Sequence, residues 1–128
     1  MKLIFLSFFF GVSTLLADED LSLRVRQEIL DQYKPVIVNV STHGITTLEF
    51  PSRIEALDGD GFSSKPDEAG EFCFTPGDSW VSLKSLRPGA EQNLNVIIQG
   101  RAYSILIRTT GMNDFVVVFK LPSQLASK

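Results

Sequence analysis

From Pro35 to Phe119 apolar and polar residues alternate in short runs, and turn-forming residues interrupt these runs at intervals of about eight to twelve positions. A period of two places successive side chains on opposite faces of a strand, so each run predicts a strand with one buried face. We therefore predict an all-β fold, an immunoglobulin-like β-sandwich of about seven or eight short antiparallel strands. Periodicity does not separate a sandwich from a small barrel, and we favour the sandwich.

The predicted strands follow one another through short connections. They cover residues 36–40, 45–50, 53–57, 71–75, 80–86, 93–98, 101–108 and 115–119. His43-Gly44 predicts a tight hairpin turn in which Gly44 takes a positive φ, and Gln99-Gly100 predicts a second two-residue turn. The last run is apolar at every position, which is typical of a strand covered on both faces.

The first seventeen residues form a different kind of segment. A short basic start, Met1-Lys2, precedes an apolar run from Leu3 to Leu16, and Ala17 is followed at once by an acidic stretch. This is the pattern of a secretory signal peptide, and we expect cleavage after Ala17. A membrane-spanning helix needs about twenty apolar residues, so an uncleaved anchor is the less favoured alternative. We expect a periplasmic or secreted protein without stable membrane insertion after cleavage.

Residues 18–34 contain apolar residues at every fourth position, namely Leu21, Val25, Ile29 and Tyr33, and Pro35 follows them. This spacing predicts a short N-terminal helix or docking segment. Packing of its apolar stripe on the domain itself is one interpretation. In the other the stripe faces outward, which makes Leu21, Val25 and Ile29 candidate partner-binding residues. The predicted organisation is a signal peptide over 1–17, the helix over 18–34, the sandwich domain over 35–121 and a polar tail over 122–128.

The charge and the metal-binding residue types exclude several classes of protein. Twelve Lys and Arg against fifteen Asp and Glu give a net charge of −3, which argues against a nucleic-acid partner because phosphate binding needs a basic surface. One His and one Cys cannot form a Cys/His zinc site or a disulfide framework. Cys73 lies between two phenylalanines in a predicted strand, so we expect a buried thiol, with an intermolecular disulfide as the alternative.

The search for catalytic chemistry finds no site. The run Asp58-Gly59-Asp60-Gly61 does not match a calcium-binding EF-hand loop, because Phe62 stands at its fifth position, where an oxygen ligand is needed. His43 lies in a predicted turn, and the chain has no G-x-S-x-G motif. We therefore predict no catalytic residue, no metal, no cofactor and no enzymatic activity. The aromatic residues Trp80, Tyr103 and Phe115 are expected in the core, with an exposed binding platform as the alternative.

Several short motifs occur in a family-like order between residues 36 and 118. They are Thr46-Thr47-Leu48-Glu49-Phe50-Pro51, Gly59-Asp60, Trp80-Val81, Asn93-Leu94-Asn95-Val96 and Arg101-Ala102-Tyr103. In this order they resemble the N-terminal domain of the TrbG/CagX family, which comprises conjugal-transfer and type IV secretion proteins of the periplasmic core complex. Gln92 stands where that family usually has Thr. The matching positions are Thr47, Phe50, Pro51, Gly59, Asp60, Trp80, Asn93, Leu94, Val96, Arg101 and Tyr103.

The resemblance implies a periplasmic β-sandwich that assembles in many copies with channel partners, and it gives the matching positions a role in folding rather than catalysis. On this basis we expect a non-enzymatic structural or accessory subunit of a type IV secretion or conjugal-transfer envelope complex. Its partners would be sibling copies and other cell-envelope channel proteins. The alternative is a stand-alone periplasmic binding or inhibitor module, or an N-terminal domain of a secretin or pilus system.

Overall fold

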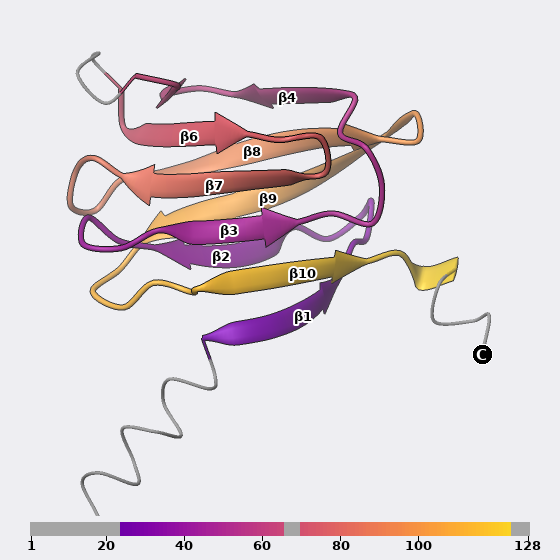
Figure 1. Ribbon diagram of the computed structural model, residues 1–128, viewed down its shortest axis with the longest axis horizontal. Helices are drawn as coiled ribbons and strands as arrows, with labels where there is room; N and C mark the ends of the chain where they lie inside the picture. Colours follow the sequence, from indigo (N-terminus) through magenta and orange to yellow (C-terminus); the bar gives the residue numbers. More distant parts are fainter. Residues whose placement is uncertain (1–23, 66–69, 124–128) are drawn as a thin grey trace, which may run out of the picture.

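The computed structural model describes residues 24–65 and 70–123, and this part of the chain is an all-β protein with two sheets (Figure 1). The six-stranded sheet has the order β1 (Val25–Ile29), β10 (Val116–Lys120), β3 (Thr46–Glu49), β7 (Trp80–Ser85), β6 (Phe72–Pro76), β5 (Phe62–Ser63). The four-stranded sheet has the order β2 (Val36–Val40), β9 (Arg101–Thr109), β8 (Glu91–Ile98), β4 (Ala56–Gly59). The prediction of an all-β fold is confirmed, with ten strands described rather than seven or eight.

Both sheets are mixed, so the prediction of purely antiparallel strands is wrong. Strand β10 runs parallel to both of its neighbours, β1 and β3, while β2 is parallel to β9 and β5 is parallel to β6. The reason is that the chain crosses between the sheets after β1 and again after β2, instead of returning beside the strand it has just left. Sequence periodicity reports which face of a strand is buried and carries no information on the strand's neighbour.

The predicted helix over residues 18–34 is wrong for its described part. Residues 25–29 form β1, which pairs with β10, and residues 18–23 lie outside the described residues, as do 1–17, 66–69 and 124–128. Residues four apart share a face in a helix and also in a strand, so the spacing of Val25 and Ile29 fits both structures. Pairing with β10 gives hydrogen-bond partners to the backbone groups on one edge of β1, and this tertiary pairing overrides the helical pattern.

The predicted hairpin at His43-Gly44 is also wrong, because β2 and β3 belong to different sheets. Gly44 has no positive φ. A Cβ atom at this position would lie 2.6 Å from Oδ1 of Asn113, so glycine is required here by close packing. The connection therefore serves as a crossing between the two sheets.

The second half of the chain follows the sequence pattern closely. Strands β6 to β10 form where runs of alternating residues predict them, and β8 and β9 are joined by Gln99-Gly100. Both turn residues have positive φ, 52° at Gln99 and 73° at Gly100, which is the geometry of a type I′ hairpin turn. Strand β10 is covered on one face only, since Val117 and Phe119 are buried while Val116 and Val118 are half-buried.

The inner faces of both sheets contribute to a single core. Its members are Leu30, Val38, Val40, Leu48, Phe50, Phe72, Val81, Leu83, Ala90, Leu94, Val96, Ile98, Tyr103, Ile105, Ile107, Val117, Phe119 and Leu121. Two stacked phenylalanine pairs lie within or against it, Phe50 with Phe119 at a ring separation of 5.0 Å and Phe62 with Phe72 at 4.9 Å. Across residues 24–65 and 70–123 there is no helix with the length and apolar character needed to cross a bilayer.

Candidate interaction surface

The outer face of the six-stranded sheet carries few charged side chains. Strand pairing places Val25, Val116, Thr47, Ser82 and Thr75 in one row across five strands, and none of these residues is charged. The row is held together in its middle by a hydrogen bond of 3.1 Å between the hydroxyl groups of Thr47 and Ser82. This row forms an uncharged strip across the sheet, with valines on β1 and β10 and hydroxyl side chains on β3, β7 and β6.

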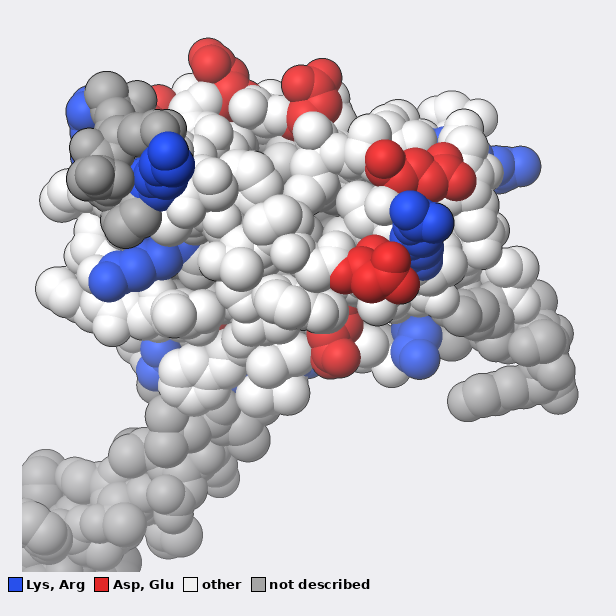
Figure 2. Space-filling view, turned by 45° about the horizontal axis from the view of Figure 1, so that its top comes forward, with Lys and Arg blue, Asp and Glu red and all other residues white. Residues whose placement is uncertain are grey.

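The neighbouring rows add only isolated charges. Gln27, Val118, Glu49 and Trp80 form the next row, and Lys84 pairs with Cys73 on the other side. A broad area without charge lies in the middle of the space-filling view, with acidic and basic side chains around it (Figure 2). Protein interfaces are depleted of charged residues at their centre, so this face has the composition of a contact surface. We refer to these two rows, together with the pairs Cys73–Lys84 and Ile29–Lys120, as the outer face.

Trp80 lies on the outer face rather than in the core, so the expectation of a buried indole is wrong. The residue is 39% exposed, and its ring lies against Gly77 so closely that a Cβ atom there would be 2.1 Å from Cε2 of the indole. The backbone N–H of Gly77 donates to the carbonyl of Trp80 at 2.7 Å, which fixes the turn before β7. Phe115 is also exposed, whereas Tyr103 is buried as expected.

Strand β1 forms one edge of the outer face, and Arg24 anchors its first residues. The guanidinium group donates to the backbone oxygen of Asn113 at 2.7 Å and to Oδ1 of the same residue at 3.0 Å. It also lies 4.0 Å from the centre of the Phe115 ring, a cation–π contact. The side chain of Asn113 is itself buried and donates to the backbone oxygen of Ile45 at 3.1 Å.

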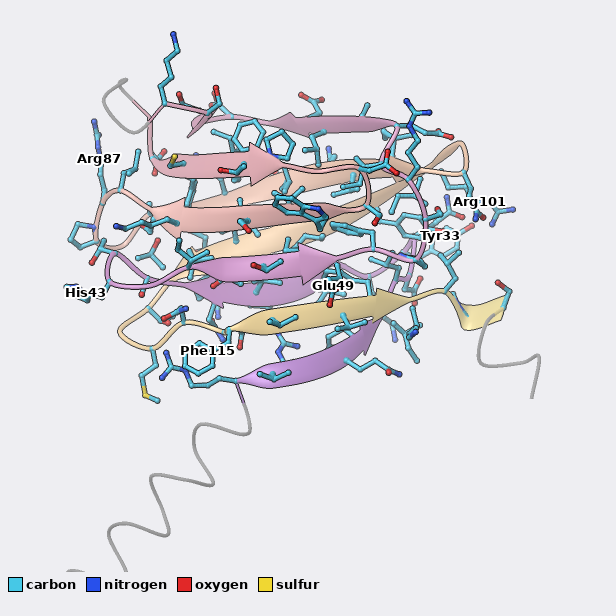
Figure 3. All side chains as sticks on the ribbon, viewed as in Figure 1. Tyr33, His43, Glu49, Arg87, Arg101 and Phe115 are labelled. Carbon is cyan, nitrogen blue, oxygen red and sulfur yellow. The ribbon has the colours of Figure 1, made fainter. Side chains whose placement is uncertain are left out.

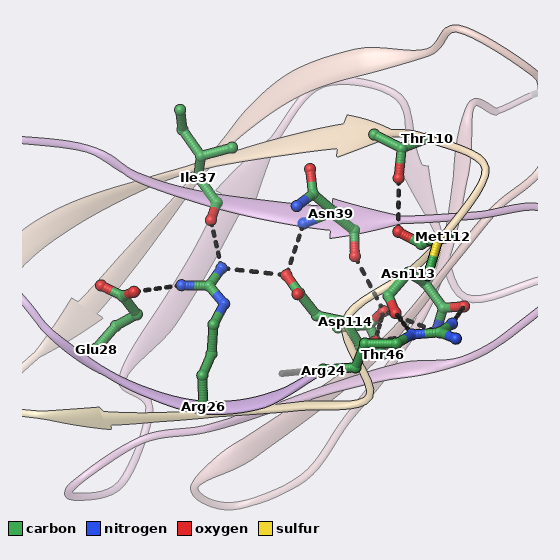
Figure 4. A network of polar contacts seen from close by, with 10 residues as sticks. All are labelled: Arg24, Arg26, Glu28, Ile37, Asn39, Thr46, Thr110, Met112, Asn113 and Asp114. Atoms are coloured by element: carbon green, nitrogen blue, oxygen red, sulfur yellow. Dashed lines mark hydrogen bonds and ion pairs between the residues drawn. The ribbon is translucent and has the colours of Figure 1, made fainter. Parts of the chain in front are cut away.

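Arg26 connects β1 with β2 in the other sheet (Figure 4). Its guanidinium group donates to the carbonyl of Ile37 at 2.7 Å, to Oδ2 of Asp114 at 3.1 Å and to the carboxylate of Glu28. Burial acts to lower the pKa of Arg26, but the hydrogen bond and the charge of Asp114, with those of Glu28, outweigh it and raise that pKa above its ordinary value. The guanidinium group is therefore a permanent cation in this network.

Asp114 closes the free edge of β2. Its carboxylate accepts the N–H of Asn39 at 2.9 Å, while its own N–H donates to the carbonyl of Asn39 at 2.8 Å. Together with the bond from Arg26 to the carbonyl of Ile37, these contacts occupy three of the backbone groups of β2 that point away from β9. A sheet edge covered in this way is a poor template for another strand.

An open groove lies between β1 and β2. Its volume is about 600 Å³, and it is lined by Arg26, Glu28, Ile29, Asp31, Lys34, Pro35, Val36 and Ile37. Tyr33 projects from the connection beside it and is 91% exposed, at the end of the molecule where Arg101 also lies (Figure 3). The lining of the groove thus combines charged side chains of both signs with apolar ones.

The predicted partner-binding residues occupy the β1 edge. Val25 and Ile29 are 54% and 43% exposed and share the outer side of β1, while Leu21 lies outside the described residues. They lie on one face, as the spacing predicts, but on a strand instead of a helix. Whether they bind a partner stays a prediction.

The family-like positions divide between the core and the surface. Phe50, Leu94, Val96 and Tyr103 are buried, and Thr47 and Pro51 are half-buried. Gly59 is closely covered by the ring of Phe62, since a Cβ atom there would lie 2.7 Å from it. The exposed positions are Gly59, Asp60, Trp80, Asn93 and Arg101. The structure therefore gives Phe50, Leu94, Val96 and Tyr103 a place in the core and leaves Trp80 and the polar positions Asp60, Asn93 and Arg101 at the surface.

The residues considered for catalysis or metal binding do not come together in the described part of the chain. His43 lies exposed in the connection between β2 and β3, at the same end of the molecule as Arg87 (Figure 3). Cys73 is a free thiol and only half-buried, on the outer face, so the expectation of a buried thiol is wrong. Among residues 24–65 and 70–123 no group of three His, Cys, Asp or Glu side chains is placed to hold a metal ion.

The polar cluster of Arg24, Arg26, Asn113 and Asp114 was not predicted as a feature of this molecule. Its members are separated by 88 or 89 residues where β1 contacts the segment before β10. Asn113 and Asp114 belong to a stretch whose local composition indicates only a turn. Contacts of such long sequence separation leave no local signal in the sequence.

Two comparisons with known proteins find no match to this chain. No protein-family model matches the chain, and no curated protein matches it. The resemblance to the TrbG/CagX family therefore stays a prediction that rests on the ordered motifs alone.

Proposed function

We propose that this protein is a non-enzymatic structural or accessory subunit of a cell-envelope complex of the type IV secretion or conjugal-transfer kind, and that it acts through protein–protein contacts. Export to the periplasm with removal of residues 1–17 is part of the proposal. The fold we propose is a β-sandwich, because the two sheets share one core. Its immunoglobulin-like type rests on the two-sheet layout, while the parallel pairing of β10 with both neighbours departs from that fold.

The outer face of the six-stranded sheet is the observation that carries this proposal. Side chains on a solvent-facing side of a sheet are usually polar or charged. This face instead has an uncharged row from Val25 to Thr75. The row runs to an edge strand with two exposed apolar side chains, Val25 and Ile29. A subunit of an assembly needs such a face, and it does not need a deep pocket.

A photo-crosslinking amino acid at Glu49 tests the proposal in intact cells. Glu49 is exposed near the middle of the outer face (Figure 3), so we expect crosslinks to envelope channel proteins, identified by mass spectrometry. The same amino acid at Arg108, on the outer side of β9 in the other sheet, is the matched control and should give far fewer. Absence of envelope proteins from the Glu49 crosslinks contradicts the proposal, and so does an equal yield at both positions.

A further inference from the structure

We infer that two copies of this chain pair through strand β1, in an antiparallel arrangement centred on Gln27, so that the two six-stranded sheets join into one. This inference deepens the proposed function, because it identifies one partner, a second copy of the chain. It also goes beyond the sequence prediction by naming the contact and its register. The evidence is the state of the β1 edge and the self-complementary order of its five residues.

The outer edge of β1 is open. The carbonyl of Arg24 accepts the N–H groups of Phe115 and Val116, and the N–H of Leu30 donates to Lys120, so the even-numbered residues of β1 direct their backbone groups to β10. The backbone groups of Val25, Gln27 and Ile29 therefore point away from the sheet. No residue in the described ranges donates to them or accepts from them. Such an edge is a template for another strand.

The other edge strands of the two sheets are covered or less suited to pairing with another strand. The edge of β2 is covered by Arg26 and Asp114, as described above. Strand β5 has two residues, and β4 has four residues, of which Ala56, Asp58 and Gly59 are exposed. Short strands, a charge and a glycine are features that keep an edge from pairing. Among the described strands, β1 is therefore the edge suited to a partner.

The sequence of β1 is complementary to itself when read in the opposite direction. In a pair centred on Gln27, Val25 lies opposite Ile29 of the second copy, and Arg26 lies opposite Glu28 of the second copy. The apolar pair falls on the outer face and the ion pair on the inner side, as the burial of these side chains requires. Oε1 of Glu28 takes the bond from Arg26 of its own chain, which leaves Oε2 to face the other copy.

The backbone supports the same register. In an antiparallel pair centred on Gln27, the residues opposite one another are those whose N–H and C=O groups point outward, namely 25 with 29, 27 with 27 and 29 with 25. Each such pair exchanges two hydrogen bonds. A shift of the register by two residues in either direction places Arg26 opposite Arg26 or Glu28 opposite Glu28, and like charges in direct opposition destabilise a pair of strands. Charge thus selects one register.

The full chain is expressed with its own N-terminal segment and purified. Sedimentation and light scattering then measure the association of two copies. We expect twice the monomer mass at high protein concentration. Gln27→Pro removes the N–H at the centre of the pair without touching the bonds to β10, so its dissociation constant should rise by about tenfold or more. Gln27→Thr keeps the N–H and is the matched control, with an unchanged constant. Circular dichroism melting shows whether the Gln27→Pro chain is folded.

Disulfide formation in a Cys73→Ser background tests the register on the unmodified β1 backbone. In the proposed pair the two residues 27 are directly opposite, about 5.5 Å apart between Cα atoms, which is within disulfide range. We expect Gln27→Cys to form crosslinked dimers under mild oxidation. Val25→Cys alone should not, whereas a mixture of Val25→Cys and Ile29→Cys chains should crosslink to one another.

Two results overturn the inference. One is a wild-type chain that stays monomeric at the highest concentration reached, and the other is Val25→Cys crosslinking to itself as readily as Gln27→Cys. Failure of the proposed function is a separate result. A monomer that still crosslinks to envelope proteins through Glu49 overturns the β1 pair alone, while a β1 dimer without envelope partners overturns the proposed function alone.

Discussion

Asp114 is the residue that joins β1, β2 and the segment before β10. It is 7% exposed and accepts hydrogen bonds from Arg26 at 3.1 Å and from the N–H of Asn39 at 2.9 Å. In Asp114→Ala the Arg26 cation loses a buried partner, and the Asn39 N–H loses its acceptor. We expect the free energy of unfolding, measured in urea, to fall by roughly 2–4 kcal/mol.

The control for this change is Asp78→Ala. Asp78 forms an ion pair with Arg53 at 3.6 Å, but both side chains are 81% exposed. An exposed ion pair contributes little to stability, so Asp78→Ala should change the free energy of unfolding by less than about 0.5 kcal/mol. Equal losses in the two variants would contradict a stabilising role that depends on the burial of Asp114.

At the scale of single elements, the β8–β9 hairpin depends on its two-residue turn. Gly100 has a φ of 73° and open space around its Cα, so Gly100→Ala meets no clash and pays only the strain of a positive φ. We expect a loss of about 1 kcal/mol of unfolding free energy. Gln99 has a φ of 52°, and Gln99→Asn should gain roughly 0.5 kcal/mol because asparagine adopts this conformation more readily.

Gly111→Ala is the matched control for the hairpin. Gly111 also has open space around it, but it has no positive φ. Its substitution should therefore leave stability unchanged or raise it slightly. A loss at Gly111 as large as that at Gly100 would show that the loss at Gly100 does not come from the turn geometry.

At the scale of the whole molecule, the two sheets depend on one core. Phe119 is 1% exposed and stacks on Phe50, whereas its neighbour Val118 lies on the outer face of the same strand. Phe119→Ala should lower the free energy of unfolding by about 3–5 kcal/mol, and Val118→Ala by less than about 1 kcal/mol. Circular dichroism and Trp80 fluorescence should report one coincident transition for both sheets. Separate transitions, or equal losses, would contradict a shared core.

The sequence could predict what depends on neighbouring residues. Alternation between Leu94 and Ile98, and between Tyr103 and Ile107, assigned the buried face of β8 and β9, because adjacent side chains in a strand point to opposite faces. The turn at Gln99-Gly100 was also predictable, because two strands separated by only two residues are joined by a tight hairpin turn. The candidate site was predictable in one part, the shared face of Val25 and Ile29.

The secondary structure of residues 25–29, the partner of each strand and the polar cluster were decided by the tertiary structure alone. Residues spaced by four fit a helix and a strand equally well, and only the pairing with β10 selects the strand. Asp114 closes the β2 edge because folding brings it to Arg26 and Asn39, which are 88 and 75 residues away. The sequence by itself thus determined an all-β chain and its core faces. The sheet order, the open edge at β1 and the uncharged outer face depend on contacts between distant segments, whose energies no local pattern records.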